Sequence, residues 1–426
     1  MAERLRVALL SYRSKPTCGG QGVYLRHISR ELVALGHHVE VFSGQPYPEL
    51  DEGVILNKVP SLDLYRDEDP FRVPKLREYR DWVDVLEFAT MCTAGFPEPL
   101  TFSLRVHREL KKRAGDFDVV QDNQTLGYGV LGIQRHLPVV GTIHHPISVD
   151  RRIELKAAKG WKKLSMRRWY GFVRMQSFVA PRLSPILTVS ESSLADIHRD
   201  FGVPQSNMRL IPLGVDTRFF HPRPRLPRRP GSIVAVASAD SPMKGVATLL
   251  RAVAKLATER DVDLTVVSRP TPGGPTEKLV AELSLHDRVR FVHGISDEEL
   301  AELIATSEVS VVPSLYEGFS LPAVEHMACG TPLVASRTGA LPEVVGDAAV
   351  QVTPGDAEEL AAVLRRLLDS PEERAAIGRR GYDRVMERYA WPVVARRTVE
   401  AYGEAIAAHR ATHGATHRAR AGRTSR

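Results

Sequence analysis

Two glutamates eight positions apart, Glu317 and Glu325, have the chemistry and spacing of a ligand-binding pair. They lie in VSVVPSLYEGFSLPAVEHMACGTPLVAS (309–336), where a buried-type apolar run leads through a turn into a helical pattern. Pro322 suits the first turn of that helix, and Gly330 follows its last residue. The sequence therefore predicts one glutamate in the turn and the other one turn inside the helix.

The backbone between the two glutamates adds a second kind of chemistry. Residues 318–321 lie at a helix start, where free N–H groups and the helix dipole attract anions. Carboxylates in such a place favour a neutral polar partner, because an ionised carboxylate accepts hydrogen bonds from two vicinal hydroxyls. We expect hydroxyls of a sugar or a ribose. The alternative is that Glu317 and Glu325 are two exposed carboxylates at a helix end.

Short β-branched runs alternate with helical patterns on both sides of this turn. The expected strands are 5–13, 37–44, 118–123, 139–145, 186–190, 232–238, 264–269, 289–294, 309–314, 332–336 and 348–352. The expected helices include 24–35, 192–202 and 246–258, and Ser296 to Glu299 forms a capping box at the start of another. Because parallel strands need helical crossovers, we expect an α/β fold of two Rossmann-like doubly wound parallel-sheet domains that face each other across a cleft. Ligands bind such sheets beyond the carboxyl ends of the strands.

The proline-rich stretch HPRPRLPRRP predicts the boundary between these domains. The expected N-terminal domain is 1–220, followed by a Pro/Arg-rich linker (221–231) and a C-terminal domain (232–390). A C-terminal helix (391–409) and a disordered basic tail (410–426) complete the prediction.

Composition sets broad limits on the class of protein. The chain has 426 residues, 43% of them hydrophobic, and a net charge of +7, which excludes disorder of the whole chain. Its three cysteines, Cys18, Cys92 and Cys329, lie far apart without a CxxC pair, which disfavours a disulfide framework or zinc site and fits a reducing compartment. No apolar run reaches membrane-spanning length. We expect a cytoplasmic protein whose membrane contact, if any, is peripheral.

Much of the positive charge is concentrated in residues 151–182. Aromatic residues alternate with these cations, and Met166, Trp169, Tyr170 and Val173 follow the spacing of one helix face. The face either packs into the core or forms an interfacial helix that docks on anionic lipid. The sequence leaves both interpretations open.

Several ordered motifs resemble the retaining nucleotide-sugar glycosyltransferases of the GT-B fold, family 4. They are CGGQGVYLRHISRELVALGHHVEVFS, TVSESSLADI, LIPLGVDTRFFHP, SPMKGVATLLRAVAKL, EGFSLPAVE and GTPLVASRTGALPEVVGD. The resemblance covers about residues 5–405, apart from 46–115 and 146–182. Residues 46–115 are the least patterned part of the N-terminal half, and we expect them to shape the acceptor site.

The resemblance implies a role for each matching residue. Glu325 should hold the donor ribose, Glu317 the hydroxyls of the transferred sugar, and Lys244 the diphosphate. His144 should point at the reacting sugar carbon, so that His144 and Glu317 are the implied catalytic residues. Further donor contacts are implied for Gly20, Gly22, Gly318, Phe319, Ser320 and Leu321. No cofactor and no metal are expected, because a lysine and a helix dipole stabilise the leaving diphosphate.

One position departs from the family pattern, and some residues allow simpler interpretations. The family usually has an arginine five positions before the lysine, where this chain has Ala239. Lys244 could be a solvated loop lysine, and His144 could be structural, with His145 as the intended residue. The glycines near residue 20 form no dinucleotide fingerprint, because Leu25 breaks the pattern, and a plain tight turn is their simpler interpretation.

The main functional hypothesis is a retaining, metal-independent transfer of a hexose from a nucleoside diphosphate sugar to an acceptor hydroxyl on a lipid or small metabolite. One alternative is a GT-B epimerase, which would release nucleotide without an acceptor. Another is a phosphorylase, and a third is a non-catalytic protein that binds anionic surfaces. A glycosidase is disfavoured, because both glutamates lie at one strand–helix junction. No nucleic-acid partner is expected, since the chain has no such motif.

Overall fold

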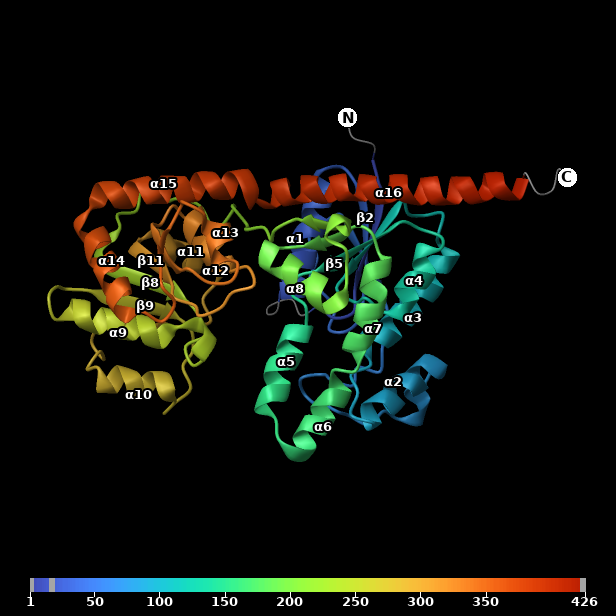
Figure 1. The fold of residues 1–426 in the computed structure, drawn as a ribbon, viewed down its shortest axis with the longest axis horizontal. Coiled ribbons are helices and arrows are strands. Elements are labelled where there is room, and N and C mark those ends of the chain that lie inside the picture. The colour runs from blue at the N-terminus through green and yellow to red at the C-terminus, as the bar shows by residue number, and fades with distance from the viewer. Residues whose placement is uncertain (1–3, 15–19, 422–426) are drawn as a thin grey trace. The chain divides into compact units, whose positions relative to one another are not determined.

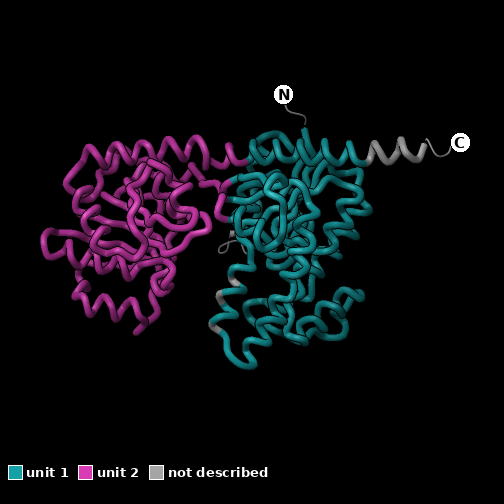
Figure 2. Tube along the Cα trace, viewed as in Figure 1, with its two compact units in different colours: residues 1–189, 193–211, 395–426 teal, residues 190–192, 212–394 magenta. Residues whose placement is uncertain are grey.

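The computed structural model describes residues 4–14 and 20–421 and divides the chain into two compact units (Figure 2). Unit 1 comprises residues 1–189, 193–211 and 395–426, and unit 2 comprises residues 190–192 and 212–394. Cys18 and Gly19 lie outside the described residues. Cys92 is an exposed free thiol and Cys329 a buried one.

Unit 1 is built on a seven-stranded parallel sheet in the order β3-β2-β1-β4-β5-β6-β7 (Figure 1). The strands are β1 (Arg6–Ser11), β2 (His38–Ser43), β3 (Val54–Lys58), β4 (Val119–Asn123), β5 (Val139–Ile143), β6 (Ile186–Thr188) and β7 (Met208–Leu210). The helices are α1 (Gly20–Ala34), α2 (Trp82–Cys92), α3 (Glu98–Lys112), α4 (Tyr128–Gln134), α5 (Ser148–Ala157), α6 (Gly160–Trp169), α7 (Phe172–Val179) and α8 (Glu191–Phe201).

Unit 2 is built on a six-stranded parallel sheet in the order β10-β9-β8-β11-β12-β13. The strands are β8 (Arg229–Val236), β9 (Asp263–Val267), β10 (Val289–Val292), β11 (Ser307–Val312), β12 (Leu333–Ser336) and β13 (Val350–Val352). The helices are α9 (Val246–Ala257), α10 (Pro275–Glu282), α11 (Asp297–Ala305), α12 (Leu321–Ala328), α13 (Leu341–Val345), α14 (Ala357–Asp369) and α15 (Pro371–Arg388), with α16 (Trp391–Ala421) running on into unit 1.

Each sheet reverses its strand order at one place, and that place predicts where a ligand binds. The order reverses between β1 and β4 in unit 1, and between β8 and β11 in unit 2. The connections that follow these two parallel strands turn away from each other, and this opens a crevice beyond the carboxyl ends of the strands. The two parallel-sheet, Rossmann-like units confirm the predicted fold class.

Most predicted strands lie where the structure has them, but two were missed. β3 is a partly exposed strand at the edge of its sheet, so it lacks the buried apolar run that marked the others. β7 is only three residues long. The predicted helix 24–35 begins earlier, at Gly20, and the capping box of Ser296 and Glu299 is present at the start of α11.

The predicted linker 221–231 belongs to unit 2 in the structure. Arg223 pairs with Glu298, and the Arg228 guanidinium donates a hydrogen bond to the Gly330 carbonyl oxygen. β8 already begins at Arg229, within the predicted linker. These side-chain contacts hold the segment against the rest of unit 2.

The C-terminal residues also differ from the prediction. α16 continues to Ala421, well past the predicted helix end at 409 and into the tail 410–426 that we expected to be disordered. Alanine recurs through this stretch and is the best helix former. From residue 395 onward α16 belongs to unit 1, where the buried Tyr402 hydroxyl donates a hydrogen bond to Gln121 Oε1.

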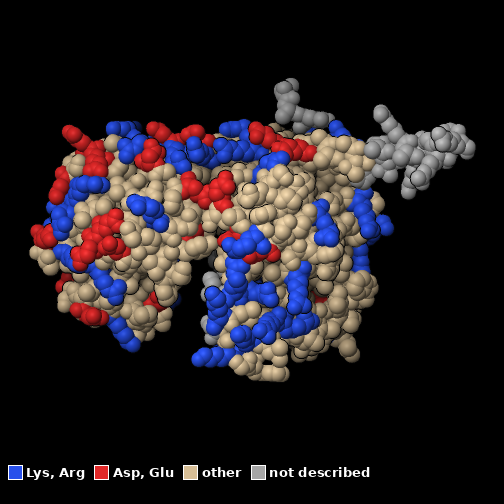
Figure 3. All heavy atoms as spheres, viewed as in Figure 1, with Lys and Arg blue, Asp and Glu red and all other residues tan. Residues whose placement is uncertain are grey.

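The structure distinguishes the two interpretations of residues 151–182. Tyr170 and Val173 are buried, and Met166 and Trp169 pack against the core of unit 1, so the predicted apolar face is core. The exposed apolar side chains of α6 are instead Trp161, which is 83% exposed, and Leu164. Figure 3 shows Lys and Arg side chains gathered over α5 and α6. No helix among the described residues is long and apolar enough to cross a bilayer.

Candidate functional site

The loop that carries Lys244 is held against the end of β11. Lys244 ends a 3-10 turn (Pro242–Lys244) that follows β8, and Gly245 comes next with φ 65°. A Cβ atom at Gly245 would lie 1.9 Å from the Pro313 carbonyl oxygen, so only glycine fits here. The Leu315 amide also donates a 2.8 Å hydrogen bond to the Met243 carbonyl oxygen. The two strands at the reversal of the sheet thus bring their following loops together.

Glu317 and Lys244 meet at this place. Lys244 Nζ lies 2.8 Å from Glu317 Oε1, and the Ser314 hydroxyl donates a 2.7 Å hydrogen bond to the same oxygen. Glu317 is only 8% exposed, so its carboxylate is largely removed from water. The Ala340 amide donates to the Glu317 carbonyl oxygen, which fixes the backbone as well. These contacts contradict the interpretation of Lys244 as a solvated loop lysine and of Glu317 as an exposed carboxylate.

The helix start after Glu317 has the features expected of an anion site. Among the described residues, no hydrogen-bond acceptor within the chain is found for the amides of Gly318 to Leu321. Ser320 has φ 86° and ψ 83°, a left-handed conformation that is costly for a residue other than glycine. Its hydroxyl is buried and has no partner in the part of the chain that the structure describes. Such strain and an unused hydroxyl support a functional role for this turn.

Glu325 lies one turn inside α12, where it is partly buried. Among the described residues its carboxylate has no ion pair or hydrogen bond. Burial, reinforced by the negative charge of Asp297, raises the pKa of Glu325 to about 7. A carboxylate in this state is free to accept hydrogen bonds from a ligand.

In unit 1, His144 lies directly after β5, and Asn123 fixes its ring. His144 Nε2 is 2.7 Å from Asn123 Oδ1, while Asn123 Nδ2 donates to the Gln21 carbonyl oxygen. The Asn123 oxygen therefore accepts, so Nε2 carries the proton and the buried Nδ1 is an acceptor without a partner in the described chain. Burial lowers the pKa of His144 to about 4, which keeps the ring neutral at physiological pH.

The structure brings the predicted unit 1 residues together around His144. Gly20 begins α1, Gly22 follows in its first turn, and Gln21 between them is the residue that contacts Asn123. The Tyr24 ring from the same helix lies 4.5 Å from the His144 ring, centroid to centroid. Lys244, Glu317, the amides of Gly318 to Leu321 and Glu325 are grouped on unit 2. The predicted site residues thus include members of both units.

Sequence reasoning missed three polar residues of unit 1. Asn123 ends β4 and Gln124 follows it, and the Gln124 side chain contacts the backbone of both His144 and His145. Polar residues directly after a buried strand were the signal that could have found them. Glu98 is buried beside Arg13, and burial raises its pKa to about 8. No local sequence pattern predicts the burial of Glu98, because Arg13 lies 85 positions away in the chain and comes close only in the folded protein.

Ala239 is buried at the position of the family's usual arginine. Its amide donates a 2.9 Å hydrogen bond to the Ser268 hydroxyl at the end of β9. The neighbouring Asp240 accepts hydrogen bonds from the amides of Thr271 and Thr276, which lower its pKa to about 2. These contacts bring the segment after β9, including the exposed Arg269, next to residue 239. Within the described residues, no three His, Cys, Asp or Glu side chains gather as a metal site.

Comparisons with known protein families divide the chain close to the boundary between unit 1 and unit 2. Residues 18–219 match the family described as Glycosyltransferase Family 4, and residues 219–384 match Glycosyl transferases group 1. The MMP alpha-(1->4)-mannosyltransferase of Mycolicibacterium hassiacum is 58% identical over 408 residues, which cover 95% of this chain and 99% of that protein. The D-inositol 3-phosphate glycosyltransferase of Thermobispora bispora is 28% identical over 94% of this chain and 95% of its own.

Solved structures share the fold at low sequence identity. The sucrose-phosphate synthase of Thermosynechococcus elongatus has a TM-score of 0.68 at 24% identity and covers 95% of this chain and 100% of its own. HepE of Anabaena, solved in complex with UDP, has a TM-score of 0.68 at 17% identity and covers 94% of this chain and 100% of its own. Both family descriptions match, and the mannosyltransferase is 58% identical. This chain is therefore a GT-B glycosyltransferase and belongs to family 4, the group 1 glycosyl transferases.

Proposed function

We propose that this glycosyltransferase moves mannose from a nucleoside diphosphate mannose to a ring 4-hydroxyl of a sugar acceptor, with retention of the α configuration. The observation that carries the proposal is the 58% identity, over 95% of the chain, to an MMP alpha-(1->4)-mannosyltransferase. A sugar acceptor replaces the broader expectation of a lipid or small metabolite. An α-linked product from an α-linked donor requires retention.

The paired Lys244 and Glu317 support the donor assignment. In the proposed complex, Lys244 leaves Glu317 to neutralise the diphosphate, and the carboxylate becomes free to accept hydrogen bonds from hydroxyls of the mannose. The unused amides of Gly318 to Leu321 add N–H donors and a helix start on the same side. Together they stabilise negative charge as it develops on the leaving diphosphate. Glu325 accepts hydrogen bonds from the ribose.

We further propose that Arg269 supplies the cation that Ala239 lacks. Arg269 follows Ser268, whose hydroxyl accepts the Ala239 amide hydrogen, and it is exposed. Among the described residues its guanidinium has no ion pair, so it is free to bind phosphate. Arg269→Ala should weaken donor binding about tenfold, whereas Arg251→Ala, on the exposed face of α9, should leave it unchanged.

On the acceptor side, His144 presents a neutral ring with a fixed tautomer. Its pKa of about 4 means that it does not act as a cationic acid near neutral pH. We propose that His144 positions the transferred mannose, while residues 46–115, with the buried Glu98, shape the acceptor site. Contact of residues 151–182 with anionic lipid stays a prediction, which co-sedimentation with anionic vesicles at low salt would test.

The first test is a thermal-shift panel of GDP-, UDP- and ADP-linked mannose and glucose on the purified chain. A midpoint rise with one mannose donor, lost in Glu325→Ala, is the expected result. Turnover with that donor and a mannoside acceptor should then yield an α-(1→4) product by NMR, with and without EDTA. Nucleotide release together with a free epimerised sugar, in the absence of acceptor, would establish the epimerase alternative instead. If no donor shifts the midpoint of a folded sample, the mannosyl transfer proposal fails.

A further inference from the structure

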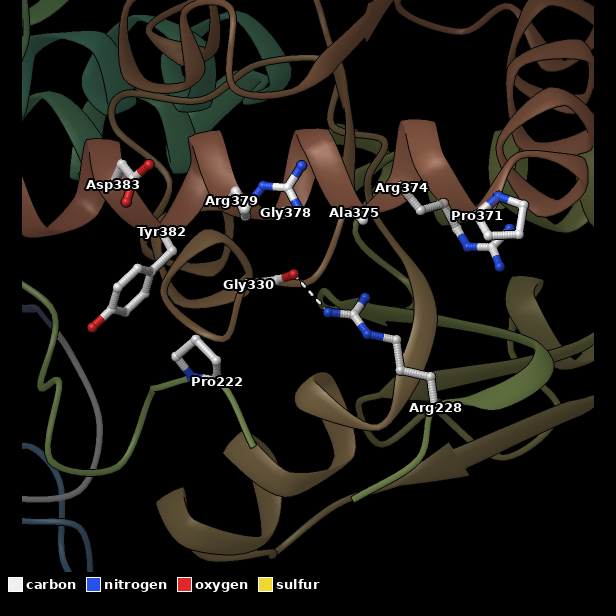
Figure 4. Close-up of a pocket in the computed structure, with 10 residues that line it drawn as sticks. All are labelled: Pro222, Arg228, Gly330, Pro371, Arg374, Ala375, Gly378, Arg379, Tyr382 and Asp383. Carbon is white, nitrogen blue, oxygen red and sulfur yellow. Dashed lines mark hydrogen bonds between the residues drawn. The ribbon is translucent and has the colours of Figure 1, made fainter. Parts of the chain in front are cut away.

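Unit 2 contains a cavity that has no role in the proposed transfer reaction. Its volume is about 410 Å³, and it lies between α15, the segment before β8 and the end of α12 (Figure 4). Its lining includes Pro222, Arg228, Gly330, Arg374, Arg379 and Tyr382. Binding sites for small molecules have volumes of roughly 300–1,000 Å³. The cavity is therefore large enough for a ligand of monosaccharide size.

Arg228 is the residue that gives this cavity its chemistry. Its guanidinium is partly buried and donates a 2.6 Å hydrogen bond to the Gly330 carbonyl oxygen (Figure 4). Among the described residues no carboxylate lies within ion-pair distance of it. Burial and the nearby positive charge of Arg374 lower the pKa of Arg228, while the charge of Glu308, which pairs directly with Arg374, acts in the opposite direction. A partly buried cation without an ion pair of its own would be stabilised by a bound anion.

The other two arginines of the cavity differ in how they are paired. Arg374 pairs with Glu308 and donates to the carbonyl oxygens that end α14, so its charge is already compensated. Arg379 is exposed and, like Arg228, has no ion pair in the described part of the chain. Arg228 and Arg379 both line the cavity, and neither charge is compensated by an ion pair in the described part of the chain. A guanidinium group donates two parallel hydrogen bonds to two oxygens of a phosphate group. Phosphate is therefore a suitable anion for this cavity.

The backbone holds the cavity in shape. Gly378 of α15 lies against Gly330, and a Cβ atom at residue 378 would come within 2.2 Å of the Gly330 carbonyl oxygen. Gly330 itself has φ 65°. The two glycines allow α15 to approach the end of α12 and leave the Gly330 carbonyl facing Arg228. This backbone contact fixes one wall of the cavity.

The two ends of the cavity differ in charge. Figure 4 shows Tyr382 and Asp383 at one end and Arg228 and Arg374 toward the other. A carboxylate accepts hydrogen bonds from hydroxyl groups, and a phenol both donates hydrogen bonds to them and accepts hydrogen bonds from them. We propose that this cavity binds a hexose phosphate, with the phosphate on Arg228 and Arg379 and the sugar hydroxyls toward Tyr382 and Asp383.

This site is separate from the donor site of the proposed function. Lys244 and Glu317 precede α12 and Glu325 lies within it, whereas Gly330 follows its last turn. An eight-residue helix is about 12 Å long. Phosphate bound at Arg228 is therefore not the diphosphate bound at Lys244, and variants can tell the two apart.

The test is isothermal titration calorimetry of the full chain with mannose 6-phosphate, inorganic phosphate and free mannose. Mannose 6-phosphate should bind at least tenfold more tightly than inorganic phosphate, and free mannose should not bind. Arg228→Gln should weaken mannose 6-phosphate binding at least tenfold, and Lys244→Ala should leave it unchanged. Arg225→Gln is the matched control, because Arg225 is exposed in the same segment and does not line the cavity.

A second variant keeps the proposal testable if Arg228→Gln fails to fold. Arg379 is exposed, so Arg379→Gln should preserve the fold and still weaken binding. Binding that survives both substitutions, or that Lys244→Ala abolishes, would overturn the site. Equal affinity for inorganic phosphate and mannose 6-phosphate would overturn the assignment of a sugar phosphate.

Discussion

Lys244 and Glu317 form an ion pair of 2.8 Å at the place where the strand order of unit 2 reverses. The Ser314 hydroxyl shares the same carboxylate oxygen. The two residues that the proposed reaction needs most are thus partners of each other in the structure. A diphosphate sugar offers each of them a new partner, so binding exchanges one set of charge-assisted hydrogen bonds for another.

Replacement of Glu317 by glutamine should separate chemistry from folding. The amide keeps the size of the side chain but removes the charge, so kcat should fall about 100-fold or more, while the melting temperature changes little. Steady-state kinetics with the mannose donor measures this. Glu277→Gln, an exposed residue of α10, is the control and should have no effect on kcat. An unchanged kcat in Glu317→Gln would contradict the catalytic role.

Donor affinity should depend on pH through Glu325. Its pKa of about 7 means that the carboxyl is mostly protonated at pH 6 and mostly ionised at pH 8. Because the ionised form accepts the ribose hydrogen bonds, the donor Kd should rise about tenfold from pH 8 to pH 6.

Two variants check the origin of this dependence. Glu325→Gln should bind weakly at both pH values, with no slope between them. Asp297→Asn removes the neighbouring charge, so the midpoint of the dependence should move to lower pH. A slope that persists in Glu325→Gln would assign the titration to another group.

Gly245 should tolerate no side chain. Alanine there would meet the Pro313 carbonyl oxygen at 1.9 Å and displace the loop that carries Lys244, so donor affinity should fall at least about tenfold, a loss of about 1.4 kcal/mol. Gly202 is the matched control, since it has a similar φ of 68° but open space around it. Gly202→Ala should cost only about 1–2 kcal/mol of stability and leave donor affinity unchanged. Calorimetry and thermal melts distinguish the two effects.

Tyr402 should contribute to the free energy of unfolding without affecting catalysis. Its buried hydroxyl is a hydrogen-bond donor to Gln121 Oε1, so Tyr402→Phe leaves a buried oxygen without that donor. The expected cost is about 1–3 kcal/mol in the free energy of unfolding. Tyr128→Phe should cost much less, because Tyr128 is 48% exposed. Equal effects in chemical denaturation would show that the Gln121 contact contributes nothing.

The sequence was sufficient to predict most strands of both sheets, and the turn and helix that carry Glu317 and Glu325. Buried strands leave an apolar run, and Glu317 and Glu325 belong to a turn and a helix that adjoin in the chain. Ser314 as a partner of Glu317 and Asn123 as a partner of His144 could not be predicted. The first contact depends on the backbone path of one short loop, and the second arises only when the ends of two neighbouring strands come together. The apolar helix face from Met166 to Val173 was also ambiguous. The same spacing of apolar residues occurs in helices that pack into a core and in helices that dock on a membrane.

The path of α16 has a consequence for how the protein is made. Unit 1 contains both the first and the last residues of the chain, while nearly all of unit 2 is synthesised in between. A nascent chain that has reached residue 394 has the whole of unit 2 but lacks the helix that carries Tyr402 against Gln121. Domains made first usually fold first, but here the N-terminal unit is completed last, after translation has passed residue 402.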